Sequence, residues 1–89
     1  MTDTQHTGTV KWYGKAKRHG RRGIQGGFGY IIPDDGSPEV KVERRAIIGN
    51  DGPFDEKTQV SLDKGQQVLY TLLDGSEIPK ARTCELYNG

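Results

Sequence analysis

The 89-residue chain has the length of one domain; only 31% of it is hydrophobic, and glycine occurs 13 times. This composition favours short strands joined by turns over packed helices. A single cysteine and two histidines without partners at metal-ligand spacing exclude a disulfide framework and a zinc site, and we expect no cofactor. The apolar runs are much shorter than a membrane span, so we expect a cytoplasmic protein without a membrane partner.

The net charge of +1 conceals an uneven distribution of charge along the chain. Residues 4–33 contain six basic and no acidic residues, whereas residues 34–89 contain seven basic and eleven acidic residues. A basic segment of this kind can form a face that binds polyanions. On charge alone, a solvated basic loop without a partner explains the pattern equally well.

Five short segments have the residue pattern of β-strands. We expect them at residues 7–13, 28–32, 39–43, 68–73 and 80–86. Residues 1–6 are expected to form a flexible tail, and the glycine-rich basic segment 15–26 a mobile loop. No stretch has the apolar stripe of a helix. Five strands in a single domain over residues 7–89 predict a small closed or nearly closed barrel, which leaves few exposed sheet edges.

Alternation along the expected strands predicts which side chains enter the core. In the third strand, Val40 and Val42 are expected to face inward between charged residues. In the fourth strand, Val68, Tyr70 and Leu72 are expected to share one face.

Aromatic residues alternate with lysine and glycine on the first two expected strands. The first strand ends in Lys11-Trp12-Tyr13, and the second begins with Phe28 and Tyr30 around one glycine. Alternation places Phe28 and Tyr30 together on the outer face, where glycine neighbours would let a base come close. Stacking of a base on such a ring is worth about 1–3 kcal/mol. The rings could simply cover the barrel, but three of them beside a lysine favour nucleic-acid binding.

Two of these segments resemble the cold-shock domain family. Residues 7–13 read Thr-Gly-Thr-Val-Lys-Trp-Tyr, which is similar to the first strand of the family. Residues 27–32 read Gly-Phe-Gly-Tyr-Ile-Ile, which is similar to its first ribonucleoprotein motif. The resemblance extends over about residues 7–86, with looser matches at residues 39–42, 46–47, 61–68 and 79–84.

The resemblance implies an all-β, five-stranded antiparallel Greek-key barrel of the OB type. It also implies a protein without catalytic residues that binds single-stranded RNA, or single-stranded DNA, on the outer face of strands one to three. An RNA-chaperone or regulatory role belongs to the same expectation. Residue by residue, the resemblance assigns contacts to Lys11, Trp12, Phe28 and Tyr30, and to Tyr13, whose family counterpart is partly buried.

The third strand departs from the family pattern. Lys41, Glu43 and Arg44 occupy positions where the family has Phe, His and Phe. Lys41 and Arg44 could replace lost stacking by phosphate contacts or by arginine stacking on a base, whereas Glu43 would repel a nearby backbone. Alternatively, this half of the face no longer binds.

The loop between the first two strands is longer than in the family and strongly basic. We expect binding to shift toward this loop, with phosphate contacts replacing stacking. The same run could be a nuclear-targeting signal, which makes the nucleus an alternative location. In the later connection, Gln59 replaces the family's loop aromatic, and Phe54 is the only aromatic residue. Phe54 could reach the same binding surface, but we expect it to pack on the barrel.

The main alternative function is a protein-interaction domain on a diverged cold-shock scaffold, with weak or no nucleic-acid binding. The acidic second half and the missing third-strand aromatics support it. An enzyme is not indicated, and we expect a monomer that binds single-stranded RNA or DNA. The predicted nucleic-acid-binding residues are Lys11, Trp12, Tyr13, Lys15, Lys17, Arg18, Arg21, Arg22, Phe28, Tyr30, Lys41 and Arg44.

Overall fold

The computed structural model describes residues 4–50, 54–55, 57–75 and 77–87. The main sheet contains β1 (His6–Gly14), β4 (Phe28–Pro33), β5 (Val40–Glu43), β6 (Gln67–Leu72) and β7 (Ala81–Leu86). A second hairpin contains β2 (Lys17–Arg18) and β3 (Ile24–Gln25). Two single 3-10 turns, η1 (Gly20–Arg22) and η2 (Arg44–Ala46), complete the secondary structure of these described residues. None of the helical segments among the described residues is long and apolar enough to cross a membrane.

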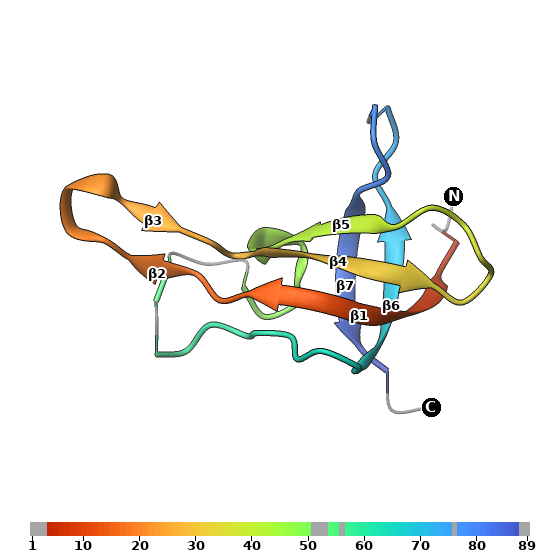
Figure 1. The fold of residues 1–89 in the computed structure, drawn as a ribbon, viewed down its shortest axis with the longest axis horizontal. Coiled ribbons are helices and arrows are strands. Elements are labelled where there is room, and N and C mark those ends of the chain that lie inside the picture. The colour runs from red at the N-terminus through yellow and green to blue at the C-terminus, as the bar shows by residue number, and fades with distance from the viewer. Residues whose placement is uncertain (1–3, 51–53, 56, 76, 88–89) are drawn as a thin grey trace.

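The main sheet has the order β5-β4-β1-β6-β7, and every neighbouring pair is antiparallel. The sheet curls so that its edge strand β7 lies beside the other edge strand, β5 (Figure 1). Its two edges are joined by isolated bridges, with the Lys41 N–H donating to the Pro79 carbonyl at 2.9 Å and the Ile48 N–H to the Cys84 carbonyl at 2.8 Å. This curled sheet confirms the all-β, five-stranded antiparallel fold of the OB type.

The core lies inside the curl of the sheet. Val40 and Val42 face inward, as predicted, and pack with other buried residues from every strand of the sheet. The prediction for Leu72 is wrong, because it is 41% exposed and Thr71 is buried in its place. The register between β6 and β7 shifts between these two residues. The extra residue is Arg82 of β7, because Thr71 pairs with Thr83 and Leu72 with Ala81, and such a bulge locally disrupts the ladder and increases its twist.

Residues 15–26, which we predicted as a loop without strands, form a hairpin that we call the arm. Lys17 pairs with Gln25 and Arg18 with Ile24, so the arm extends away from the sheet (Figure 1). The tip turns through η1, which begins at Gly20 and is followed by Gly23; both have positive φ, a conformation that glycine adopts readily. The composition of the arm did not indicate that β2 and β3 pair, because Ile24 is the only β-branched residue in it.

The first strand also begins earlier than predicted. His6, which we assigned to the tail, pairs with Tyr70 in the β1–β6 ladder. The two rings stack with centroids 5.5 Å apart. The N-terminal part of β1 is thereby fixed on the side of the sheet formed by β6.

Cys84 provides a test of this core. Its side chain is fully buried, and burial, with a smaller contribution from Glu85, raises the pKa of the thiol from 9.0 to about 12. Because the thiolate is the reactive form, we expect almost no reaction with a disulfide reagent at pH 8 while the protein is folded. The same thiol should react fully in urea, which the absorbance of the released thiolate measures. Equal rates in the folded and unfolded protein would contradict this burial.

The raised pKa also predicts the sign of a pH dependence. The folded state favours the neutral Cys84 thiol. The contribution of this thiol to the free energy of unfolding is therefore fully present below pH 9 and is lost as the pH rises toward 12. Part of the fall in unfolding free energy across this window should disappear in Cys84→Ala. Urea denaturation of both proteins at several alkaline pH values measures the difference.

Candidate nucleic-acid interface

Three aromatic side chains meet on the outer face of β1 and β4. Trp12 and Tyr30 are cross-strand partners with ring centroids 5.4 Å apart, and Phe28 contacts Trp12 edge-on at 5.5 Å. Trp12 and Phe28 remain 40% and 38% exposed, while Tyr30 is half-buried. We call these three residues the aromatic cluster. The outward placement predicted for Phe28 and Tyr30 is confirmed.

A bulge in β1 determines that Trp12 belongs to this cluster. Strict alternation would place Trp12 on the same side as the buried Val10, but the register with β4 shifts between these residues. Lys11 and Trp12 are therefore both exposed, and Tyr13 turns inward against the core. Burial raises the pKa of the Tyr13 hydroxyl, with a smaller opposing effect of Arg44. The structure thus separates Tyr13 from the outer face on which we expected it to contribute.

Gly29 determines how closely the two strands approach below the rings. It is buried, and a methyl group there would overlap the Trp12 carbonyl oxygen and lie 2.8 Å from the Tyr13 Cα. Its missing side chain therefore serves strand packing, whereas the sequence had suggested access for a base. This close pairing holds Phe28 and Tyr30 beside Trp12.

Two lysines adjoin the cluster, and each already contacts a neighbour. Lys41 Nζ lies 5.2 Å from the centroid of the Phe28 ring, a cation–π contact. Lys11 Nζ donates to Glu39 Oε1 at 2.6 Å, and both side chains are about half exposed. An exposed ion pair contributes only about 0–1 kcal/mol. Lys11 can therefore exchange this partner for a phosphate at little cost.

Phe54 connects the arm to η2. The guanidinium carbons of Arg18 and Arg44 lie 5.7 Å and 5.2 Å from its ring centroid. Gln59 strengthens the same connection, because its side-chain amide donates to the Ala16 carbonyl at 2.8 Å. We expected Phe54 to pack on the barrel, and the structure shows its ring in contact with one arginine of the arm and one of η2. The sequence gave no indication that these three residues would meet.

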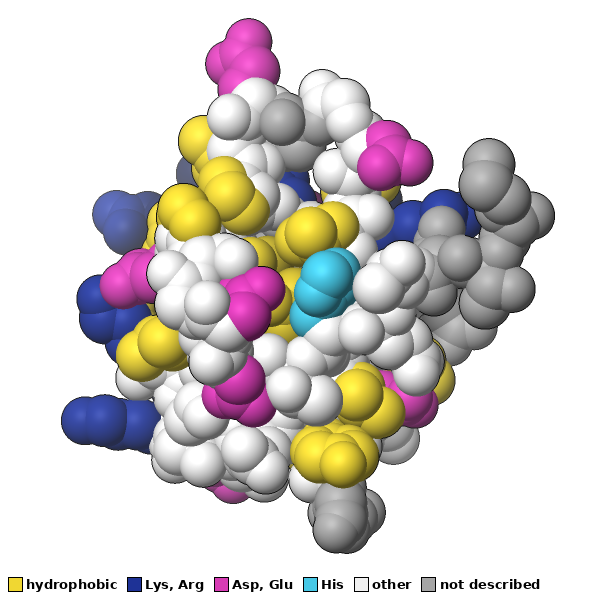
Figure 2. Space-filling view, turned by 90° about the vertical axis from the view of Figure 1, so that its right-hand side faces the viewer, with side chains coloured by type: hydrophobic (Ala, Val, Ile, Leu, Met, Phe, Trp, Pro, Cys, Tyr) yellow, Lys and Arg dark blue, Asp and Glu magenta, His cyan; other side chains and the backbone are white. Residues whose placement is uncertain are grey.

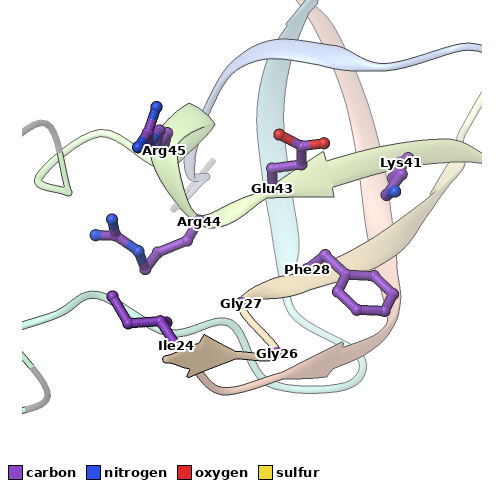
Figure 3. Close-up of a pocket in the computed structure, with 8 residues that line it drawn as sticks. All are labelled: Ile24, Gly26, Gly27, Phe28, Lys41, Glu43, Arg44 and Arg45. Carbon is purple, nitrogen blue, oxygen red and sulfur yellow. The ribbon is translucent and has the colours of Figure 1, made fainter. Parts of the chain in front are cut away.

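A pocket of about 310 Å³ lies between the arm and β5–η2 (Figure 3). Predicted site residues Phe28, Lys41 and Arg44 line it, together with Ile24 and Arg45, which sequence reasoning missed. An isolated isoleucine in a basic segment was the available signal for Ile24. The remaining lining residues are Gly26, Gly27 and Glu43.

The other predicted basic residues lie along the arm rather than at the aromatic cluster. All of them are exposed, namely Lys15, Lys17, Arg18, Arg21 and Arg22. The β1–β4 pair runs from Gly14 opposite Phe28 at the arm to Gly8 opposite Pro33 at the other end. Asp34 and Asp35 follow directly there, and Figure 2, viewed from this end, shows acidic side chains near a hydrophobic area. The positive charge is therefore concentrated at the arm end of the barrel.

A small OB-type barrel with exposed rings and adjacent cations defines a class of single-strand-binding domain. No protein-family model matches the chain. The chain is 39% identical over 75 residues to cold shock-like protein CspB of Yersinia pestis, covering 84% of each chain. It is 36% identical over 74 residues to cold shock-like protein CspC of Escherichia coli K12 and 35% identical to that of Buchnera aphidicola, covering 83% of this chain and 84% of each relative.

The chain therefore belongs to the cold-shock protein family, which makes it a nucleic-acid-binding cold-shock domain. The relatives are bacterial proteins and give the nuclear alternative no support.

Replacement of Phe54 by Ala tests the connection between the arm and η2. A cation–π contact at an exposed site contributes about 0.5–1 kcal/mol, so losing two contacts should accelerate amide hydrogen exchange in the arm by about 5- to 30-fold. Phe54→Trp, which keeps an aromatic face for both arginines, should leave exchange unchanged. NMR measures both variants, and identical arm exchange in Phe54→Ala and wild type would contradict the connection.

Proposed function

We propose that this protein binds single-stranded nucleic acid, preferably RNA, without catalysing a reaction on it. Unpaired bases stack on Trp12, Phe28 and Tyr30, and a duplex binds more weakly because its bases are already stacked and paired. The observation that carries this proposal is the position of the Phe28 and Tyr30 rings, each with its centroid within 5.5 Å of the Trp12 ring centroid, on one exposed surface of a cold-shock domain. Each ring offers a π-face that accepts any base.

Positive charge around the cluster supports the same proposal. Lys11 and Lys41 flank the rings, and the arm extends the basic surface beyond them. A strand that crosses the aromatic cluster can continue along the arm, where its phosphates meet the exposed lysines and arginines. Arg44 adds charge where the arm approaches η2.

The proposal includes the setting in which such binding acts. A sequence-tolerant surface that takes unpaired bases can keep RNA from forming structure or can regulate it, as an RNA chaperone or regulator. Unpaired RNA occurs in the cytoplasm, which is the location that we propose. A single barrel carries the whole surface, so a monomer suffices and no cofactor enters the interaction.

Replacement of Trp12 by Ala tests the stacking surface. We expect affinity for a single-stranded RNA octamer to fall by about 5- to 150-fold, which corresponds to the loss of one stacked base. Tyr87→Ala is the matched control, because Tyr87 is an aromatic residue of similar exposure, 39%, that follows β7. Fluorescence anisotropy of labelled RNA measures both. Equal losses in the two variants, or none in Trp12→Ala, would remove Trp12 from the interface.

Neutralisation of the arm tests the electrostatic part of the interface. For single strands, the logarithm of affinity falls with the logarithm of salt by about 0.7 per neutralised phosphate. Changing all five basic arm residues to Ser should therefore reduce this slope by up to about 3.5. Lys57→Ser with Lys64→Ser, in the connection before β6, should leave the slope unchanged. An unaltered slope in the arm variant would exclude the arm from binding.

A second candidate function is protein interaction, and one observation favours it. Leu73 and Ile78, in the connection between β6 and β7, are 47% and 48% exposed. Exposed apolar groups of this kind occur at protein-binding sites. Trp12 fluorescence separates the two functions, because an oligonucleotide quenches it only if bases reach the aromatic cluster. No response to any single strand at low salt would favour protein interaction.

A further inference from the structure

We propose that the pocket between the arm and η2 is an additional subsite, which holds one unpaired base of the strand bound to the aromatic cluster. This inference rests on the proposed function. The base would lie between Ile24 of β3 and Arg44 of η2. The arm thereby acts as a wall of the binding site, in addition to supplying charge.

The side chains of Ile24 and Arg44 form two facing walls. In Figure 3 they extend in the same direction from opposite sides of a gap, with Phe28 at the other end of the pocket. Ile24 is 46% exposed on a segment whose other large side chains are polar or charged. An apolar side chain can cover one face of a base, and a planar guanidinium can stack on the other.

Two glycines allow close packing at the base of the arm, beside the pocket. Gly26 and Gly27 have φ values of 80° and 79°, which residues with side chains rarely adopt. A Cβ atom on Gly27 would lie 3.2 Å from the Cβ of Arg44, and one on Gly26 would lie 2.7 Å from the Lys15 carbonyl oxygen. Side chains at these positions would crowd the wall formed by Arg44 and the base of the arm.

Phe54 fixes the distance between the walls. Arg18 is the cross-strand partner of Ile24, and its guanidinium contacts the same Phe54 ring as that of Arg44. The two walls come from segments far apart in the sequence. The Arg44 N–H donates to the Gly27 carbonyl at 2.6 Å beside the base of the arm, and the Phe54 ring adds a second connection through Arg18. The ring therefore keeps the pocket assembled before a strand arrives.

Volume and charge indicate a nucleotide as the occupant. At about 310 Å³, the pocket is at the lower end of the roughly 300–1,000 Å³ of small-molecule sites, which suits one base. Lys41, Arg44 and Arg45 outnumber Glu43 around it, so the lining attracts an anion. Glu43 is also within 3.9 Å of Lys80 Nζ, which offsets part of its repulsion of a phosphate. Phe28 lines the pocket and belongs to the aromatic cluster, so one strand can reach both.

The test follows the Ile24 methyl groups by NMR during titration with a single-stranded RNA octamer that has no self-complementarity. A series of the same octamer carries one abasic nucleotide at each position in turn. We expect an upfield ring-current shift of the Ile24 methyls, lost when one particular base is missing. Removal of that base should lower affinity by about 5- to 150-fold.

Two variants test the walls separately. Ile24→Ser and Arg44→Lys should each abolish the dependence of affinity on that one base, and Arg44→Lys should keep the salt dependence because it keeps the charge. Ile78→Ser is the matched control, with similar exposure but outside the pocket, and should behave as wild type. Quenching of Trp12 with no base-dependent shift of Ile24 would overturn the subsite and leave the proposed function standing. Absence of both signals would overturn the two together.

Discussion

The pairing of β1 with β4 is the interaction on which the rest of the structure depends. Gly29 allows these strands to approach closely, and the bulge after Val10 places Lys11 and Trp12 together on the outside. The same pairing brings Trp12 against Tyr30 and leaves Tyr13 to fill the core. A regular ladder without the bulge would bury Trp12 with Val10 and disperse the aromatic cluster.

The arm connects β1 to β4 and enlarges the surface that the barrel can offer to a nucleic acid. The strand β5 carries no aromatic side chain, but Lys41 in it and Arg44 directly after it contact the rings of Phe28 and Phe54. The arm brings Arg18 to the same Phe54 ring. Cations held on aromatic faces are thus a recurring local arrangement here.

Much of the fold follows from patterns that are local in the sequence. Period-two alternation places Val40, Val42 and Tyr30 correctly, because one face of each strand must be buried. Alternation fails at Leu72 and would fail at Trp12. Both residues lie at bulges, and a bulge depends on the register between two strands, which one strand's sequence does not contain. The pairing within the arm could not be predicted from alternation either. The arm has few apolar residues of its own, and its contacts are with Gln59 and Phe54, which lie far away in the sequence.

The sequence by itself determined the positions of the five strands of the main sheet to within a residue or two, the family resemblance, the outward direction of Phe28 and Tyr30, and the location of positive charge. Each of these depends on residue type or on alternation within a short segment. Only the tertiary structure decided that Trp12 joins those rings, that Tyr13 does not, and that Ile24 faces Arg44 across a pocket. Those outcomes depend on strand register and on contacts between distant segments, which are set when the barrel closes.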